Sequence, residues 1–211
     1  MPRENLAEIT AHALREQLID GDLPAGSRIN EVELARSLEV SRTPLREALH
    51  IVSQDGLIEL LPRRGYFVRP LSPHEFRSLY EMRQILDPEA LRRAGVPKRE
   101  VLHALVELNH SIDAADTPAR VIELDDEWHR LLLIGCPNRF LLEEIERFMR
   151  LTRRYELAYF RARGHVDVAL QEHERILSHL VRGELDHACN ALRTNMTSGI
   201  GPITEWLKDR Q

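Results

Sequence analysis

The sequence predicts a mainly α-helical fold: a small N-terminal domain with a short β-hairpin, followed by an antiparallel all-α bundle of about six helices. Three observations support this prediction. Apolar residues recur at helical spacing through most of the 211 residues. Two short apolar runs flank a Pro-Arg-Arg-Gly turn between Ile58 and Val68. From Ser72 onward, Gly and Pro separate helical patterns by short loops, as in a bundle.

The first seventy residues predict three helices and a hairpin. Residues 5–20 form the first helix, with an inner side made of Leu6, Ile9, Ala13, Leu14 and Leu18. The turn-rich run 21–26 ends this helix. Residues 31–38 and 43–54 form two short helices around a tight connection at 39–41. Strands at 58–60 and 66–68 complete a winged helix-turn-helix.

The helix at 43–54 has a buried side and a polar side. Leu45, Ala48, Leu49 and Val52 recur at helical spacing and face the core. Thr43-Pro44 suits a helix start, because Thr can cap free amides and Pro fits the first helical position. The start of a recognition helix enters the major groove. The candidate DNA-contacting residues are therefore at this helix start and in the hairpin turn: Ser41, Arg42, Thr43, Arg46, Arg63, Arg64 and Gly65.

Composition limits the classes of function. The net charge is −5, and the first seventy residues hold nine Arg against eleven Asp and Glu, a balance of −2. This argues against a protein that coats nucleic acid, so DNA binding must depend on where the arginines are placed. No apolar run could span a bilayer and no export signal is visible, which predicts a cytoplasmic protein with no membrane partner. Cys136 and Cys189 are expected to be reduced thiols.

The second part of the chain predicts the bundle. Arg69-Pro70-Leu71 is the expected linker, dividing a DNA-binding domain at 1–69 from a helical domain at 70–211. Ser72-Pro73-His74-Glu75 is a capping-box sequence that opens a helix to about residue 93. A second helix is expected to end at about residue 114, a third to run from Thr117 to about 135, and a fourth from Asn138 to about 162. After a break at Gly164, a fifth is expected from Asp167 to 182 and a sixth at 184–198. A short tail helix is expected after Pro202.

Several of these helices place one polar group on an apolar stripe. Asp125 and His129 share a stripe with Trp128, while His173, Asn195 and Arg83 each lie on the stripe of a different helix. Buried polar groups without partners cost a few kcal/mol each, so mutual contact around an internal cavity for a metal or ligand is the economical arrangement. Taken singly, each could instead be a satisfied core residue, with Asp125 as the private partner of His129.

The N-terminal motifs closely resemble the DNA-binding domain of GntR-family bacterial transcription regulators. The matching residues are Gly21, Leu23-Pro24-Ala25-Gly26, Glu33-Leu34-Ala35, Val40-Ser41-Arg42-Thr43-Pro44-Leu45-Arg46-Glu47-Ala48-Leu49, Gly56-Leu57-Ile58 and Gly65-Tyr66-Phe67-Val68. Residues 72–198 resemble the FCD effector domain of the FadR-type branch, with a length close to that of the VanR-like subgroup. There the matching residues are Arg83, Leu124 to His129, Asn138, Glu172 to Leu177, Gly183 to Asp186 and Ala188.

The resemblance implies a metal site. In many relatives an Asp and three His hold a divalent metal that helps bind a carboxylate effector. Asp125, His129 and His173 fall on three of these ligand positions, and Asn195 occupies the fourth. This donor set suits Zn, Ni or Mn, although an amide oxygen is a weaker donor than imidazole. Without a metal, Arg83 and Arg153 could hold an anionic effector by charge-assisted hydrogen bonds.

Together these patterns predict a sequence-specific, DNA-binding transcription regulator that senses a small metabolite, with a carboxylate as the expected effector. One head buries little surface, so a homodimer on a palindromic double-stranded operator is expected, with repression as the default sign. Two alternatives remain. The first is a metal-dependent hydrolase in the bundle, for which no motif supplies a general base or an oxyanion site. The second is a plain dimerisation bundle with no effector.

Overall fold

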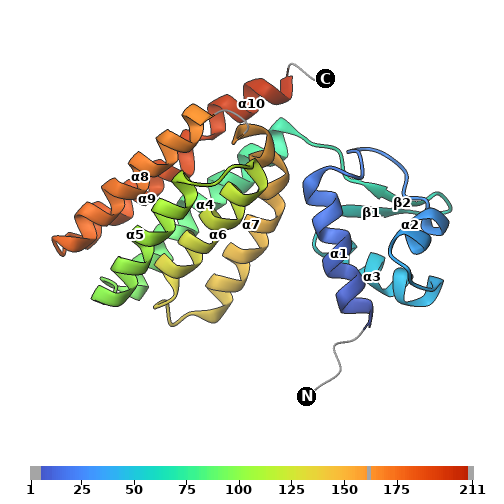
Figure 1. The fold of residues 1–211 in the computed structure, drawn as a ribbon, viewed down its shortest axis with the longest axis horizontal. Coiled ribbons are helices and arrows are strands. Elements are labelled where there is room, and N and C mark those ends of the chain that lie inside the picture. The colour runs from blue at the N-terminus through green and yellow to red at the C-terminus, as the bar shows by residue number, and fades with distance from the viewer. Residues whose placement is uncertain (1–5, 161–162, 209–211) are drawn as a thin grey trace. The chain divides into compact units, whose positions relative to one another are not determined.

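The computed structural model describes residues 6–160 and 163–208. The chain forms two compact units, Met1–Leu71 and Ser72–Gln211, and each is described by itself (Figure 1). In the described part of the chain, no helix combines the length and the apolar character needed to cross a membrane.

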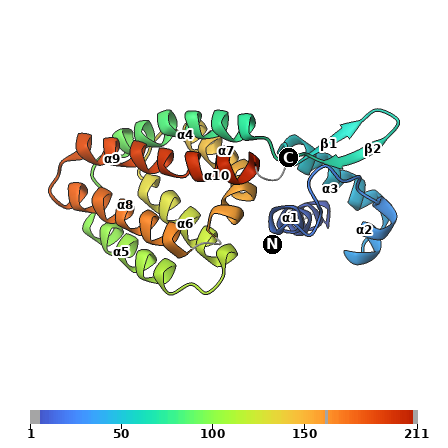
Figure 2. The same cartoon turned by 90° about the horizontal axis from the view of Figure 1, so that it is seen from above.

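Unit 1 is a winged helix-turn-helix, as predicted. It contains α1 (Leu6–Asp20), α2 (Glu31–Ser37), α3 (Arg42–Gln54), β1 (Ile58–Leu61) and β2 (Gly65–Val68). The two strands pair antiparallel, with Ile58 opposite Val68 and Leu61 opposite Gly65. The segment before α2 adds a short third edge, because Arg28 bridges to Phe67 and the Ile29 amide donates to the Tyr66 carbonyl at 2.9 Å. The hairpin tip projects away from the helices (Figure 2).

The inner face of α1 differs from the prediction. Leu14 and Leu18 are buried as expected, but Leu6 and Ile9 are 53 % and 49 % exposed. Counting back from Leu14 in steps of three and four residues leads to positions 11, 10 and 7, which are Ala, Thr and Ala, and all three are buried. The small residues let α1 pack closely against α3, whose Leu45, Ala48, Leu49 and Val52 are fully buried.

The start of α3 also differs. Ser41 is the N-cap and the helix begins at Arg42, so Thr43 and Pro44 are its second and third residues. Pro44 is tolerated there because the first four helical N–H groups have no intrahelical acceptor in any case. The start of the first helix predicted at residue 5 lies outside the described residues.

Unit 2 is an antiparallel helical bundle (Figure 1). Its described helices are α4 (Pro73–Ala94), α5 (Arg99–Asp113), α6 (Pro118–Leu133), α7 (Arg139–Tyr159), α8 (Arg163–Val181), α9 (Leu185–Ser198) and α10 (Ile200–Lys208). Helix α4 packs against α7 and α9, α8 against α5 and α9, and α6 against α5 and α7. The predicted caps are present: Ser72, Thr117 and Asn138 each accept a backbone hydrogen bond at 3.2–3.3 Å from the residue three positions later.

Two predicted breaks in the bundle are wrong. Helix α8 begins at Arg163, so Gly164 and Asp167 lie inside it. Helix α10 begins at Ile200, two residues before Pro202, which occupies a first-turn position that needs no N–H donor. The fourth bundle helix ends at Tyr159, and its predicted end at Ala162 falls outside the described residues.

Candidate functional site

A polar groove in unit 1 brings together two of the four arginines predicted to contact DNA, Arg42 and Arg46. Its volume is about 430 Å³, and it is lined by Arg28, Ile29, Asn30, Glu31, Val32, Arg42, Arg46 and Gly65. Ser41, Arg42, Thr43 and Arg46 are all exposed at the start of α3. Arg28 was not predicted to line this groove, because its position depends on a single β-bridge to Phe67 that no local sequence pattern predicts.

An acidic neighbour holds Arg46 at the groove. Its Nε donates to Glu31 Oε2 at 2.9 Å, while the Arg46 side chain remains 67 % exposed. Glu31 lies in the first turn of α2, where the helix dipole favours a carboxylate. A phosphate or base edge that engages Arg46 through Nε would therefore compete with Glu31.

The wing turn is tight and strained. The Arg64 amide donates to the Leu61 carbonyl at 3.0 Å, which places Pro62 and Arg63 at the centre of the turn. Arg63 adopts φ 64°, a left-handed conformation that costs a residue with a side chain about 1–2 kcal/mol. Gly65 has φ 92° and meets the predicted need for glycine, although the central left-handed position belongs to Arg63. The Arg64 guanidinium lies 5.0 Å from the centroid of the Phe67 ring, a cation–π contact.

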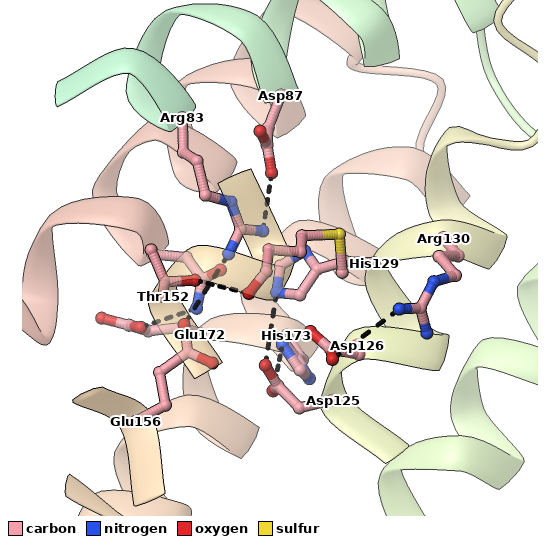
Figure 3. A network of polar contacts seen from close by, with 12 residues as sticks. Arg83, Asp87, Asp125, Asp126, His129, Arg130, Thr152, Glu156, Glu172 and His173 are labelled. Carbon is pink, nitrogen blue, oxygen red and sulfur yellow. Dashed lines mark hydrogen bonds and ion pairs between the residues drawn. The ribbon is translucent and has the colours of Figure 1, made fainter. Parts of the chain in front are cut away.

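In unit 2, the three predicted metal ligands converge. Asp125 and His129 come from α6 and His173 from α8, and they point toward one another (Figure 3). Asp125 Oδ2 lies 3.7 Å from His129 Nε2, and Asp125 Oδ1 lies 3.5 Å from His173 Nε2. One ligand atom from each residue lies within 4.8 Å of the others. The inward-facing polar residues predicted on α6 and α8 thus lie close together in the core of the bundle.

The orientation of His173 is fixed from behind. Its Nδ1 lies 3.0 Å from Asn109 Oδ1, and because an amide oxygen only accepts, Nδ1 carries the proton. Nε2 then keeps its lone pair, buried and without a hydrogen-bond partner. The indole of Trp128 stacks on the His173 ring, with ring centroids 3.7 Å apart and an interplanar angle of 2°. Asn109 was not identified from sequence, although its place between the buried Leu105 and Ile112 on α5 was a readable signal.

Electrostatics keep both histidines neutral. Burial lowers the pKa of His173 to about 3 and lowers the pKa of His129 as well. Burial also raises the pKa of Asp125, and the negative charges of Glu156 and Asp126 raise it further. A lone pair and a carboxylate that face one another are two acceptors, so they need a shared cation or proton between them.

The cavity around these residues is small and acidic. Its volume is about 40 Å³, and its lining includes Tyr80, Arg83, Asp125, His129, Glu156, Glu172 and Asn195. Arg83 is already paired: its Nη2 lies 2.9 Å from Asp87 Oδ2 and its Nη1 lies 3.8 Å from Glu156 Oε1. Its one positive charge is therefore opposed by Asp87 and Glu156 before any other anion arrives.

Asn195 occupies the predicted fourth position with its oxygen available. Its Nδ2 donates to Glu172 Oε2 at 2.9 Å, while its Oδ1 is buried and has no partner among the described residues. Ser198 Oγ donates to the same Glu172 oxygen at 2.9 Å. Arg153, the second predicted effector residue, is half-buried on α7 and does not appear among the described residues that line the cavity.

These residues fit a divalent metal. One carboxylate, two neutral imidazoles and an amide oxygen are nitrogen and oxygen donors of the kind that Zn, Ni and Mn accept. A metal-binding histidine typically donates its other ring N–H to an oxygen, as His173 does to Asn109. A cavity of about 40 Å³ has room for an ion and a few waters, since roughly 10–15 Å³ of such space holds one water. A metabolite needs the cavity to widen.

A chain of contacts joins the cavity to the start of unit 2. Tyr80 Oη donates to Glu156 Oε1 at 2.5 Å, and the Tyr80 ring packs on Phe76 with centroids 4.6 Å apart. Phe76 in turn packs on Tyr155, whose hydroxyl accepts from the Ser72 amide at 3.2 Å. Tyr155 and Glu156 are neighbours on α7. Tyr155 thus contacts the start of α4, and Glu156 forms part of the cavity wall.

Comparison with known proteins matches both units. Residues 6–68 match the family described as bacterial regulatory proteins, gntR family, and residues 78–198 match the FCD domain. The Nta operon transcriptional regulator of Aminobacter aminovorans is 36 % identical over 124 residues, which cover 57 % of this chain and 59 % of that protein. The HTH-type transcriptional repressor RspR of Escherichia coli strain K12 is 27 % identical over 196 residues, which cover 91 % of this chain and 84 % of that protein. The solved structure of Escherichia coli McbR/YncC has a similar fold, with a TM-score of 0.81, 19 % identity and coverage of 96 % and 99 %.

Proposed function

Since this chain belongs to the GntR family of bacterial transcription regulators, in the branch that carries an FCD domain, we propose that it is a metabolite-responsive repressor. In this proposal the helical unit binds a small carboxylate through a divalent metal, and binding changes the affinity of a homodimer for a palindromic operator in the cytoplasm. The hydrolase alternative is set aside, because the matching families and relatives are regulators and not enzymes.

One observation carries the sensing part of this proposal. The lone pair of His173 Nε2 is buried, unpartnered and aimed at Asp125, an arrangement that a shared cation resolves. When bound there, a divalent metal supplies positive charge and open coordination positions for an anionic oxygen. His129 and Asn195 complete the donor set, while Asn109 holds His173 in the correct tautomer.

The charge balance explains why a metal is needed for an anionic effector. Asp125, Glu156 and Glu172 all line the cavity, and Arg83 is already engaged by acids. A carboxylate that entered without a metal would meet like charges in a buried site, where water screens them weakly. Arg83 therefore serves mainly to balance these acids and is a secondary contact for the effector.

The DNA-binding part rests on the groove and the wing. Arg42 and Arg46 are exposed at the start of α3, the position from which recognition helices read base edges. Arg28 extends the positive side of the groove, and Arg63 and Arg64 carry charge to the hairpin tip. A single head of this size buries too little surface for specific affinity, so two heads on two half-sites are required.

The deciding experiment combines metal analysis with DNA release. We expect Asn195→His to retain more Zn, Ni or Mn through purification than the natural chain, because imidazole replaces a neutral amide. His173→Ala should lose the metal and, with it, the release of an operator fragment by small carboxylates. Genomic footprinting of the purified protein supplies that fragment. If chelation leaves the response to carboxylates intact, the metal-based proposal is wrong; if no carboxylate releases the operator, the carboxylate-sensing proposal is wrong.

A further inference from the structure

A second cluster of metal-binding side chains lies at the corner where α8 is followed by α9. His179 comes from the last turn of α8, Glu184 is the N-cap of α9, and His187 lies in the first turn of α9. His179 Nδ1 lies 2.7 Å from Glu184 Oε2, and the two imidazole rings have centroids 5.4 Å apart at 23°. One ligand atom from each of the three residues lies within 4.8 Å of the others.

We propose that this corner is a second site for a divalent transition metal, separate from the cavity and more accessible to solvent. Two imidazoles and one carboxylate are the ligands that Zn²⁺ takes in three-ligand protein sites, with water in the fourth position, and Ni²⁺ and Cu²⁺ accept the same donors. None of its ligands takes part in the cavity, so this site does not depend on the function proposed above.

Metal binding needs side-chain rotation at this corner. In a tetrahedral site with bonds of about 2.1 Å the ligand atoms lie about 3.4 Å apart, so the ligand atoms, which lie within 4.8 Å of one another, have to adjust by about 1 Å. The side chains of His179 and Glu184 are 23 % and 38 % exposed, and His187 is exposed. They project from helix ends around Gly183, whose φ of 74° forms the turn. Side chains in this setting can rotate without disturbing the core.

A cation already occupies this corner. Arg182 Nη2 lies 3.0 Å from Glu184 Oε2 and 3.0 Å from His179 Nδ1, so one guanidinium meets two of the three ligands. It therefore stands in for the ion and competes with it. Removing this guanidinium should strengthen metal binding, whereas removing His187 should weaken it. Opposite effects of substituting Arg182 and His187 would identify the site.

The position of the corner gives the site a consequence for the bundle. Helix α8 carries Glu172 and α9 carries Asn195, and both residues line the cavity. An ion bound at the corner would link the end of α8 to the start of α9 across three residues of turn. It would hold together the two helices whose side chains hydrogen-bond at Glu172 and Asn195.

The test is a Zn²⁺ titration of the full, tag-free chain by calorimetry, with circular dichroism to verify folding of each variant. We expect His187→Gln to weaken one class of Zn²⁺ site by about tenfold or more, because loss of a group that only supports a ligand already costs about 10–100-fold. Arg182→Gln should strengthen that same class. His110→Gln is the matched control: His110 is a 72 % exposed histidine beside one glutamate, Glu107, at 3.8 Å.

The outcomes separate this site from the cavity. His173→Ala should leave the corner class of Zn²⁺ binding unchanged, and His187→Gln should leave the amount of metal held in the cavity unchanged. The proposal is overturned if His187→Gln and His110→Gln bind Zn²⁺ with the same stoichiometry and affinity as the natural chain. Weaker binding in Arg182→Gln would also overturn it, because the guanidinium would then support the ion and not compete with it.

Discussion

Replacing Arg83 with Met tests whether this arginine balances buried charge or anchors an incoming anion. The Arg83 side chain is 3 % exposed, and the carboxylate 2.9 Å away, on Asp87, is 0 % exposed. Met retains much of the apolar bulk and removes the positive charge, so Asp87 loses its partner. Burial already raises the pKa of Asp87, and a buried carboxyl with no cation beside it takes up a proton.

The magnitude follows from that proton. An aspartate that titrates near 3.9 in the unfolded chain costs about 1.36 kcal/mol per pH unit to keep protonated, which is about 4 kcal/mol at pH 7. Loss of one partner of a buried ion pair typically costs about 3–5 kcal/mol, in agreement. In a chain of this size the midpoint temperature should fall by about 8–16 °C.

The sign of the pH dependence is specific. In Arg83→Met the folded state holds the Asp87 proton and the unfolded state does not, so acid stabilises the folded state. The destabilisation should therefore shrink to about 1.5 kcal/mol at pH 5. An arginine that serves only as a ligand anchor would give a small loss of stability with no such trend.

The assay is thermal or urea unfolding between pH 5 and 7.5, with Arg93→Met as the control. Arg93 pairs with Glu89 at 2.7 Å on the same helix and also four residues apart, but these side chains are 51 % and 43 % exposed. An exposed pair of this kind contributes about 1 kcal/mol or less. Equal losses for the two variants, or a loss for Arg83→Met that does not change with pH, would refute the reasoning.

Three further predictions concern unit 1. Replacing Arg63 and Arg64 together with Ala should reduce the slope of log K against log[salt] for operator binding by about 1–2 per head, because fewer counterions are released, and an unchanged slope would mean that the wing does not contact phosphate. Arg46→Ala should weaken operator binding by about tenfold or more in a gel-shift titration, while Glu31→Gln, which frees Arg46, should strengthen it by a few-fold. Glu39→Gly should raise stability by about 0.5–1 kcal/mol in thermal unfolding, since Glu39 has φ 55° and glycine adopts that conformation without strain; a lower midpoint would contradict this.

The sequence predicted what local chemistry decides. Ser72, Thr117 and Asn138 cap their own helices, so the starts of α4, α6 and α7 were correct. Asp125 and His129 are four residues apart on one helix, and their common direction follows from the helical period alone. The meeting of that pair with His173 was a prediction about packing, and the geometry of the described residues supports it.

Features that depend on tertiary register were not predictable in this way. The contact between Asn109 and His173 exists because α5 packs against α8, and no spacing in either helix specifies that pairing. Arg28 reaches the groove through a bridge to Phe67, a partner 39 positions away in sequence. The start of α8 was placed too late because Gly164 was interpreted as a break, although glycine in a first helical turn is tolerated when the rest of the helix is packed.

The neighbouring residues Tyr155 and Glu156 connect the cavity wall to the start of the bundle. A cavity of about 40 Å³ can admit a metabolite only if its walls move, and Glu156 is part of that wall. One peptide bond joins Glu156 to Tyr155, so a turn of α7 that withdraws the carboxylate also shifts the hydroxyl that receives the Ser72 amide. Ser72 is the first residue of the bundle unit. A molecule that displaced Glu156 on binding would therefore also displace the residue where the chain enters the bundle.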